Sequence, residues 1–147
     1  MAKGGKNAAM QHLLEWDYVP EYELLGISSS MGSHRLAWAF NRAFGWHMAC
    51  ADDVLAAPSK SKEPSSHPTL RWIDEASGTS VTLVLNRTSD GTLANGAGAL
   101  DYLLVVHHLE TPPHELMAEL RRLREVSFVT ALDPEAIGAL EPLMVLD

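Results

Sequence analysis

The order of secondary-structure signals along the chain predicts an α+β protein. Helical apolar periodicity occurs twice, and strand-like runs lie before, between and after the two helical segments. We therefore expect the order β-α-β-β-β-α-β, with two helices packed on one face of a mixed, mostly antiparallel sheet. A chain of 147 residues has the size of one domain. We expect residues 1–15 to be a loosely ordered N-terminal lead-in and residues 16–147 to form that single domain.

The first half of the chain supplies one strand and one helix. Tyr22–Ser28 has the composition of a strand, and the serine-rich segment up to Ser33 predicts a turn with N-cap chemistry. Ser33–Trp46 is helical in pattern, and Gly45 near its end is typical of a helix stop. Ala56–Pro68, rich in proline and serine, predicts a mobile loop. The apolar arc of the helix contains Leu36, Ala39, Phe40, Ala43 and Phe44.

The second half supplies the remaining strands and the second helix. Alternating apolar residues around a short turn predict a hairpin, and the apolar run after the next glycine-rich turn is typical of a strand covered on both faces. Consecutive prolines then open a helix whose core stripe is Leu116, Leu120 and Leu123. The expected ranges are Thr69–Asp74, Thr79–Asn86 and Leu100–His107 for strands, Thr111 to about Arg124 for the helix, Val126–Leu132 for the last strand and Pro134–Leu146 for an apolar, partly helical tail.

Composition narrows the classes of function. The formal net charge is −8 and the sequence pI is about 5.3, which argues against nucleic-acid binding, because phosphates favour a basic surface. Cys50 is the only cysteine, so the chain has no internal disulfide framework and no multi-cysteine metal site. The first residues lack a signal-peptide apolar run, and no segment could span a bilayer. We expect a cytoplasmic protein without membrane contact.

Short patches of the chain resemble the IPExxVDY family of small bacterial proteins. They are the segment 21–29 (Glu-Tyr-Glu-Leu-Leu-Gly-Ile-Ser-Ser), Arg35 to Trp38 with Asn41, Asp52-Asp53, Asn86-Arg87, and Asp101-Tyr102 before an apolar strand. In the signature itself, 95–97 (Asn-Gly-Ala) replaces Ile-Pro-Glu and Leu100 replaces valine, so that only Asp101 and Tyr102 match. The family is described by its motif rather than by an activity, so the resemblance implies no reaction, cofactor or catalytic residue.

The outer side of the first helix is the candidate binding surface. Arg35, Trp38, Asn41 and Arg42 lie outside the apolar arc, and Trp38 is three and four positions from the two arginines. This spacing allows a guanidinium group to stack on the indole, and both residue types anchor protein interfaces. Because large aromatics are usually mostly buried, coverage of Trp38 by the N-terminal segment or the C-terminal tail is the slightly favoured alternative.

A catalytic cysteine is one further hypothesis. His47, Cys50 and Asp53 are spaced by three, so a helical turn would place them on one side, as a nucleophile, a base and a carboxylate require. The ordinary explanation, which we favour, is a free cysteine that packs as a small apolar side chain.

A histidine-based metal site is a weaker hypothesis. His107 and His108 point to opposite faces if the strand persists through both, and Ala118 occupies the place of the second histidine of a zinc helix that would begin at His114. We therefore expect no metal ligand and no cofactor.

Two other patterns have structural explanations. The segment 96–101 imitates the start of a dinucleotide fingerprint, but it lacks the third glycine and precedes a strand, so it predicts a turn. Arg121, Arg122 and Arg124 close the second helix, where cations complement the helix dipole.

Together these observations favour a non-catalytic protein-interaction or regulatory module with a protein partner. The alternative is a small enzyme with a polar pocket near Asn41, Asp53 and Asp101. Perturbed carboxylates in such a pocket would favour the enzyme, and a flat or grooved apolar patch around Trp38 would favour the module. The sequence is also compatible with a homodimer.

Overall fold

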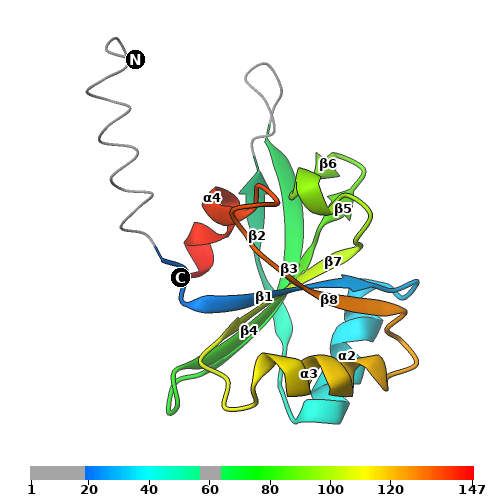
Figure 1. The fold of residues 1–147 in the computed structure, drawn as a ribbon, viewed down its shortest axis with the longest axis vertical. Helices are drawn as coiled ribbons and strands as arrows, with labels where there is room; N and C mark the ends of the chain where they lie inside the picture. The colour runs from blue at the N-terminus through cyan, green and yellow to red at the C-terminus, as the bar shows by residue number, and fades with distance from the viewer. Residues whose placement is uncertain (1–18, 57–63) are drawn as a thin grey trace.

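The structure, a computed structural model, describes residues 19–56 and 64–147, so the predicted lead-in of residues 1–15 lies outside the described residues. A six-stranded antiparallel sheet carries two longer helices on one face and a short helical segment on the other (Figure 1). The α+β class is confirmed. None of the helices in these two ranges is long and apolar enough to cross a bilayer.

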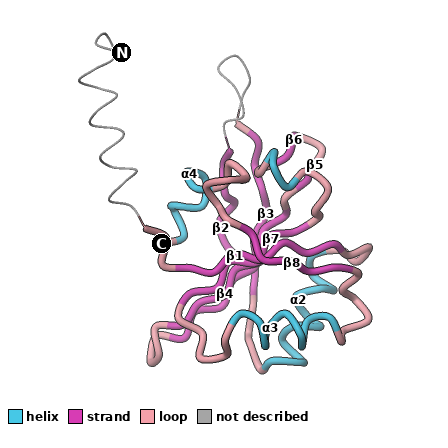
Figure 2. The backbone as a smooth tube through the Cα atoms, viewed as in Figure 1, coloured by secondary structure: helices cyan, strands magenta, loops and turns pink. Residues whose placement is uncertain are grey.

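The main sheet has the spatial order β2-β3-β4-β7-β1-β8. Its strands are β1 (Tyr22–Ser28), β2 (Ala49–Ala56), β3 (Ser65–Asp74), β4 (Thr79–Leu85), β7 (Tyr102–His107) and β8 (Phe128–Leu132). A separate ribbon consists of β5 (Arg87–Thr88) and β6 (Gly91–Thr92). The helices are α2 (Ser33–Phe44), α3 (Pro113–Arg121) and α4 (Leu140–Leu143), and the 3-10 turns are η1 (Asn95–Ala97) and η2 (Met144–Leu146), as Figure 2 shows by colour.

The sheet differs from the prediction in strand number and in direction. Each pairing within it is antiparallel, so the sheet is not mixed. The unpredicted strand is β2, an edge strand with an irregular register between Ala51 and Val54. Only Val54 and Ala56 are buried in it, so it lacks the apolar alternation that marks a strand.

The predicted loop Ala56–Pro68 is shorter than expected. Ala56 ends β2 and β3 begins at Ser65, while residues 57–63 lie outside the described residues. Pro68 is inside β3, between the pairs Ala51↔Thr69 and Val54↔His67, and so lies opposite the irregularity. A residue without an amide N–H is tolerated there, because the ladder of hydrogen bonds is already interrupted.

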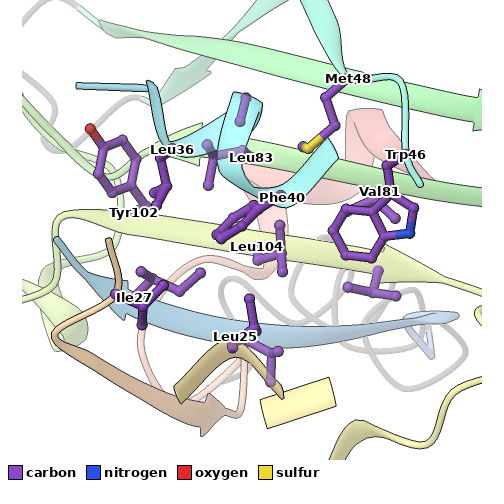
Figure 3. Close-up of a cluster of buried hydrophobic side chains, with 14 of the residues drawn as sticks. Leu25, Ile27, Leu36, Phe40, Trp46, Met48, Val81, Leu83, Tyr102 and Leu104 are labelled. Atoms are coloured by element: carbon purple, nitrogen blue, oxygen red, sulfur yellow. The ribbon is translucent and has the colours of Figure 1, made fainter. Parts of the chain in front are cut away.

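Both longer helices pack on the same face of the sheet, as predicted. Leu36 and Phe40 of α2 are completely buried, and Leu116 and Leu120 of α3 belong to the same cluster. Figure 3 shows Phe40 pointing from α2 toward the strands below it, with Trp46 beside it. The sheet contributes alternate residues to this cluster, among them Leu25, Ile27, Val81, Leu83, Leu104 and Val106.

The intervening strand residues face the C-terminal tail. Leu103 and Val105 of β7 are buried there against Leu143 and other tail residues, so β7 is covered on both faces, as predicted. Polar contacts also hold this tail: Arg71 donates a hydrogen bond to the Leu146 carbonyl oxygen at 3.0 Å. Burial lowers the pKa of Arg71 below its ordinary value.

Candidate functional site

The outer side of α2 carries an exposed aromatic and two cations. Arg35, Trp38 and Arg42 are exposed, and Trp38 has 48% of its surface accessible. The guanidinium carbon Cζ lies 4.9 Å from the Trp38 ring centroid for Arg35 and 5.3 Å for Arg42. The expected stacking is therefore present. Coverage of Trp38 by the tail is wrong, since the tail packs on the opposite face of the sheet; the N-terminal segment lies outside the described residues.

The loop before α2 is fixed by the start of β7. The backbone N–H of Ser29 donates to Oδ2 of Asp101 at 2.9 Å, and the Tyr102 hydroxyl donates to the Met31 carbonyl oxygen at 2.6 Å. The N-cap residue is Gly32, which has no side chain to cap the helix, contrary to the predicted serine cap. Asp101 and Tyr102, the two residues that resemble the family signature, thus hold the loop that leads into α2.

Tyr102 stays a hydrogen-bond donor over the physiological range. Burial, and to a smaller extent the negative charge of Asp101, raise the pKa of Tyr102 above its ordinary value of 10.0. Both effects disfavour a phenolate at this position, so the bond to Met31 is retained at neutral pH.

The end of α2 is fixed by Asn41 and Gly45. Gly45 adopts φ 73° and its N–H donates to the Asn41 carbonyl oxygen at 2.9 Å, as expected for a glycine stop. The Asn41 side chain accepts from the Met48 N–H at 2.9 Å and donates to the Met48 carbonyl oxygen at 3.3 Å. These bonds position the chain that enters β2. Asn41 is half-buried, unlike the exposed Arg35, Trp38 and Arg42 with which the sequence analysis grouped it.

A second wall faces α2 across a hollow of about 400 Å³, which we call the arginine groove. The second wall is the turn after α3, because α3 ends at Arg121 rather than near Arg124. Nothing local predicts this meeting, since Arg42 and Arg122 are far apart in the sequence. The lining residues are Arg35, Trp38, Ala39, Arg42 and Ala43 from α2, and Arg122, Leu123, Arg124 and Glu125 from the turn.

The cations of the arginine groove lack ion pairs within the described residues. The ion pairs of the described residues lie outside the groove: they join Arg87 to Asp101 at 3.6 Å, His107 to Asp147 at 2.7 Å and His108 to Glu21 at 3.8 Å. Glu125 lines the groove, but its carboxylate is not within ion-pair distance of any of the four guanidinium groups. The groove is therefore a positively charged site on an acidic protein.

The residues of the enzymatic alternative are engaged separately. Asp53 accepts a hydrogen bond from the Ser66 hydroxyl at 2.6 Å, Asp101 accepts from Ser29, and the Asn41 amide binds Met48. Asp53 lines a different hollow, between β2 and α4, whose lining contains neither Asn41 nor Asp101.

The cysteine hypothesis loses its geometric basis. Cys50 and Asp53 lie in β2, so the helical turn that would gather them with His47 is absent. Cys50 is exposed, so the alternative of a small buried side chain is also wrong.

The histidines that follow β7 are separated as well. His107 is buried and contacts Ser80 and Asp147, whereas His108 is exposed and adopts φ 52° beyond the strand. In the part of the chain that the structure describes, no group of three His, Cys, Asp or Glu side chains is arranged to hold a metal ion.

A serine–histidine contact escaped the sequence-based reasoning. The Ser65 hydroxyl lies 2.6 Å from Nε2 of His67, and Nδ1 of His67 lies 2.7 Å from the Leu85 carbonyl oxygen. Ser65 is 1% and His67 0% exposed. The pair satisfies its polar atoms inside the protein, and its burial leaves no access for a substrate.

No family model, no curated protein and no solved structure matches the chain.

Proposed function

We propose that the protein is a non-catalytic protein-interaction or regulatory module whose partner surface is the arginine groove. The observation that carries this proposal is the half-exposed Trp38 ring with the guanidinium groups of Arg35 and Arg42 over it. Tryptophan and arginine are the residue types that most often dominate interface energies. The stacking already restrains these side chains, so they would lose less conformational entropy when a partner binds.

The alternative, a small enzyme with a pocket near Asn41, Asp53 and Asp101, has no comparable support. The three side chains bind three different parts of the protein, and a reaction centre needs its groups to face one point. The resemblance to the IPExxVDY family and a cytoplasmic location stay predictions. The contacts of Asp101 and Tyr102 with the loop before α2 support a structural role for both residues.

Site-specific photo-crosslinking tests the proposed surface. A photo-reactive amino acid at Ala43, which is exposed and lines the arginine groove, should give defined adducts with proteins in a lysate of the source cells. The matched control carries the same group at Ile73, which is 55% exposed on β3 and outside the groove. Trp38→Ala should abolish the Ala43 adducts. Identical adducts from both positions, or adducts that persist in a folded Trp38→Ala variant, would contradict the proposal.

A further inference from the structure

We propose that the arginine groove binds an acidic segment of a partner protein, with its carboxylates on the guanidinium groups and an apolar side chain against Trp38. This inference rests on the proposed function and specifies the chemistry of the partner. Three properties of the groove carry it: the local concentration of positive charge, the exposed apolar surface between the cations, and the division of the cations between two walls.

The charge of the groove is exceptional for this chain. The sequence contains seven arginines, of which four line the groove, while the formal net charge of the protein is −8. Within the described residues none of these four has an ion-pair partner. Like charges at a surface repel one another, so clustering them without counter-ions is unfavourable. A ligand that supplies carboxylates would remove this repulsion.

The groove also presents apolar surface. Trp38 is half-exposed, Leu123 is half-buried, and Ala43 is exposed. The volume of about 400 Å³ is within the range of ligand sites, which is about 300–1,000 Å³. A segment that carries an apolar side chain between acidic ones would satisfy both the cations and the apolar surface.

The placement of the arginines favours several anionic groups over one. Arg35 and Arg42 come from α2, whereas Arg122 and Arg124 come from the facing turn. Carboxylates distributed along a peptide can meet both walls, and Arg binds carboxylates in a bidentate manner. A single phosphate would leave part of this charge uncompensated.

Nucleic acid fits the groove less well. A long polyanion would extend beyond the groove onto a protein whose net charge is strongly negative. The geometry therefore points to a short acidic peptide.

Fluorescence anisotropy with a labelled peptide tests this inference. The peptide has glutamates on both sides of a leucine, and its control has glutamine at each glutamate position. We expect the glutamate peptide to bind the full chain at least about tenfold more tightly than the glutamine peptide, and to weaken as salt is raised. Arg35→Gln with Arg42→Gln, and separately Arg122→Gln with Arg124→Gln, should each reduce its affinity about tenfold or more.

Arg121→Gln is the matched control for these variants. Arg121 is exposed at the end of α3 and does not line the groove, so its loss removes a nearby charge without removing a wall. Its affinity for the peptide should stay within about twofold of the unaltered protein, as expected for a charge outside the contact surface. All the substituted arginines are exposed, and circular-dichroism melting curves would establish that each variant is folded.

Several outcomes would overturn the inference. Equal binding of the glutamate and glutamine peptides, an Arg121→Gln effect as large as that of the groove variants, or tighter binding of a single-stranded oligonucleotide would each do so. If Ala43 adducts form with partner proteins while the glutamate peptide fails to bind, the acidic-segment inference is wrong and the proposed interaction function stands. If both fail, both are wrong.

Discussion

The inner and outer sides of α2 show how differently one short helix can use its aromatic residues. On the inner side, Phe40 is completely buried between the helix and the sheet. On the outer side, Trp38 is two residues away in the sequence and about half exposed, with guanidinium groups over its ring. The inner side stabilises the fold and the outer side carries the proposed contact surface, so substitutions should separate stability from binding.

The largest effect should come from the inner side. Phe40→Ala should lower the free energy of unfolding by about 3–5 kcal/mol, because removal of a buried aromatic ring leaves a cavity beneath α2. Urea denaturation followed by circular dichroism measures this loss. A loss below about 1 kcal/mol would show that the inner side contributes no more than a surface position.

A smaller loss should follow at the end of α2. Asn41→Ala should cost about 1–3 kcal/mol, since it leaves the Met48 N–H and carbonyl oxygen without their side-chain partner. Asn41→Asp keeps the acceptor for the Met48 N–H and loses the donor. Its free energy of unfolding should lie between those of Asn41→Ala and the unaltered protein. Unfolding that is unchanged in Asn41→Ala, together with weakened peptide binding, would return Asn41 to the binding surface.

The start of α2 should make stability depend on alkaline pH. Tyr102→Phe removes the bond to Met31 and should cost about 1 kcal/mol at neutral pH. The folded state raises the pKa of Tyr102, so its stabilising contribution is complete below pH 10.0, the ordinary pKa, and is lost as pH rises through the higher folded-state pKa. The difference in unfolding free energy between the two proteins should therefore shrink in this alkaline range.

Denaturant titrations of both proteins at a series of pH values test this dependence. Because Tyr102→Phe retains every other titrating group, those groups largely cancel from the difference. A difference that grows above pH 10.0 would have the wrong sign for a raised pKa.

The smallest effects on stability should come from the outer side. Trp38→Ala should cost about 1 kcal/mol or less, and Arg42→Ala less than about 0.5 kcal/mol, because both side chains are exposed. Thermal denaturation ranks these variants beside Phe40→Ala. A Trp38→Ala melting temperature as low as that of Phe40→Ala would place Trp38 in the core and contradict the interaction surface.

The regular core was accessible to sequence reasoning, while an irregular edge was not. The alternation in β4 and the apolar run of β7 predicted their places, because buried strands must be apolar on each covered face. Strand β2 was missed because, as an irregular edge strand, it buries only two of its residues. An exposed edge imposes little apolar pattern on the sequence, so periodicity carries no signal there.

The candidate site was half predictable for a related reason. The cation–aromatic contacts of Trp38 follow from helical spacing, and the structure contains them. The lining of the groove contains Arg122 and Arg124 and does not contain Asn41. Helical spacing could not predict this, because it depends on where the turn after α3 lies. Cations at the end of a helix are explained by its dipole alone, so the local sequence contains no signal that those arginines face α2.

The sequence by itself determined the α+β class, the two longer helices on one face, the burial of Phe40 and the pairing of Trp38 with its arginines. These properties depend on local spacing and on which faces must exclude water. The tertiary structure decided that Trp38 stays exposed, that Asn41 holds the chain after α2, and that four arginines from two distant segments share one groove. These properties depend on how packed elements approach one another, and that approach is fixed by the whole core rather than by any local pattern.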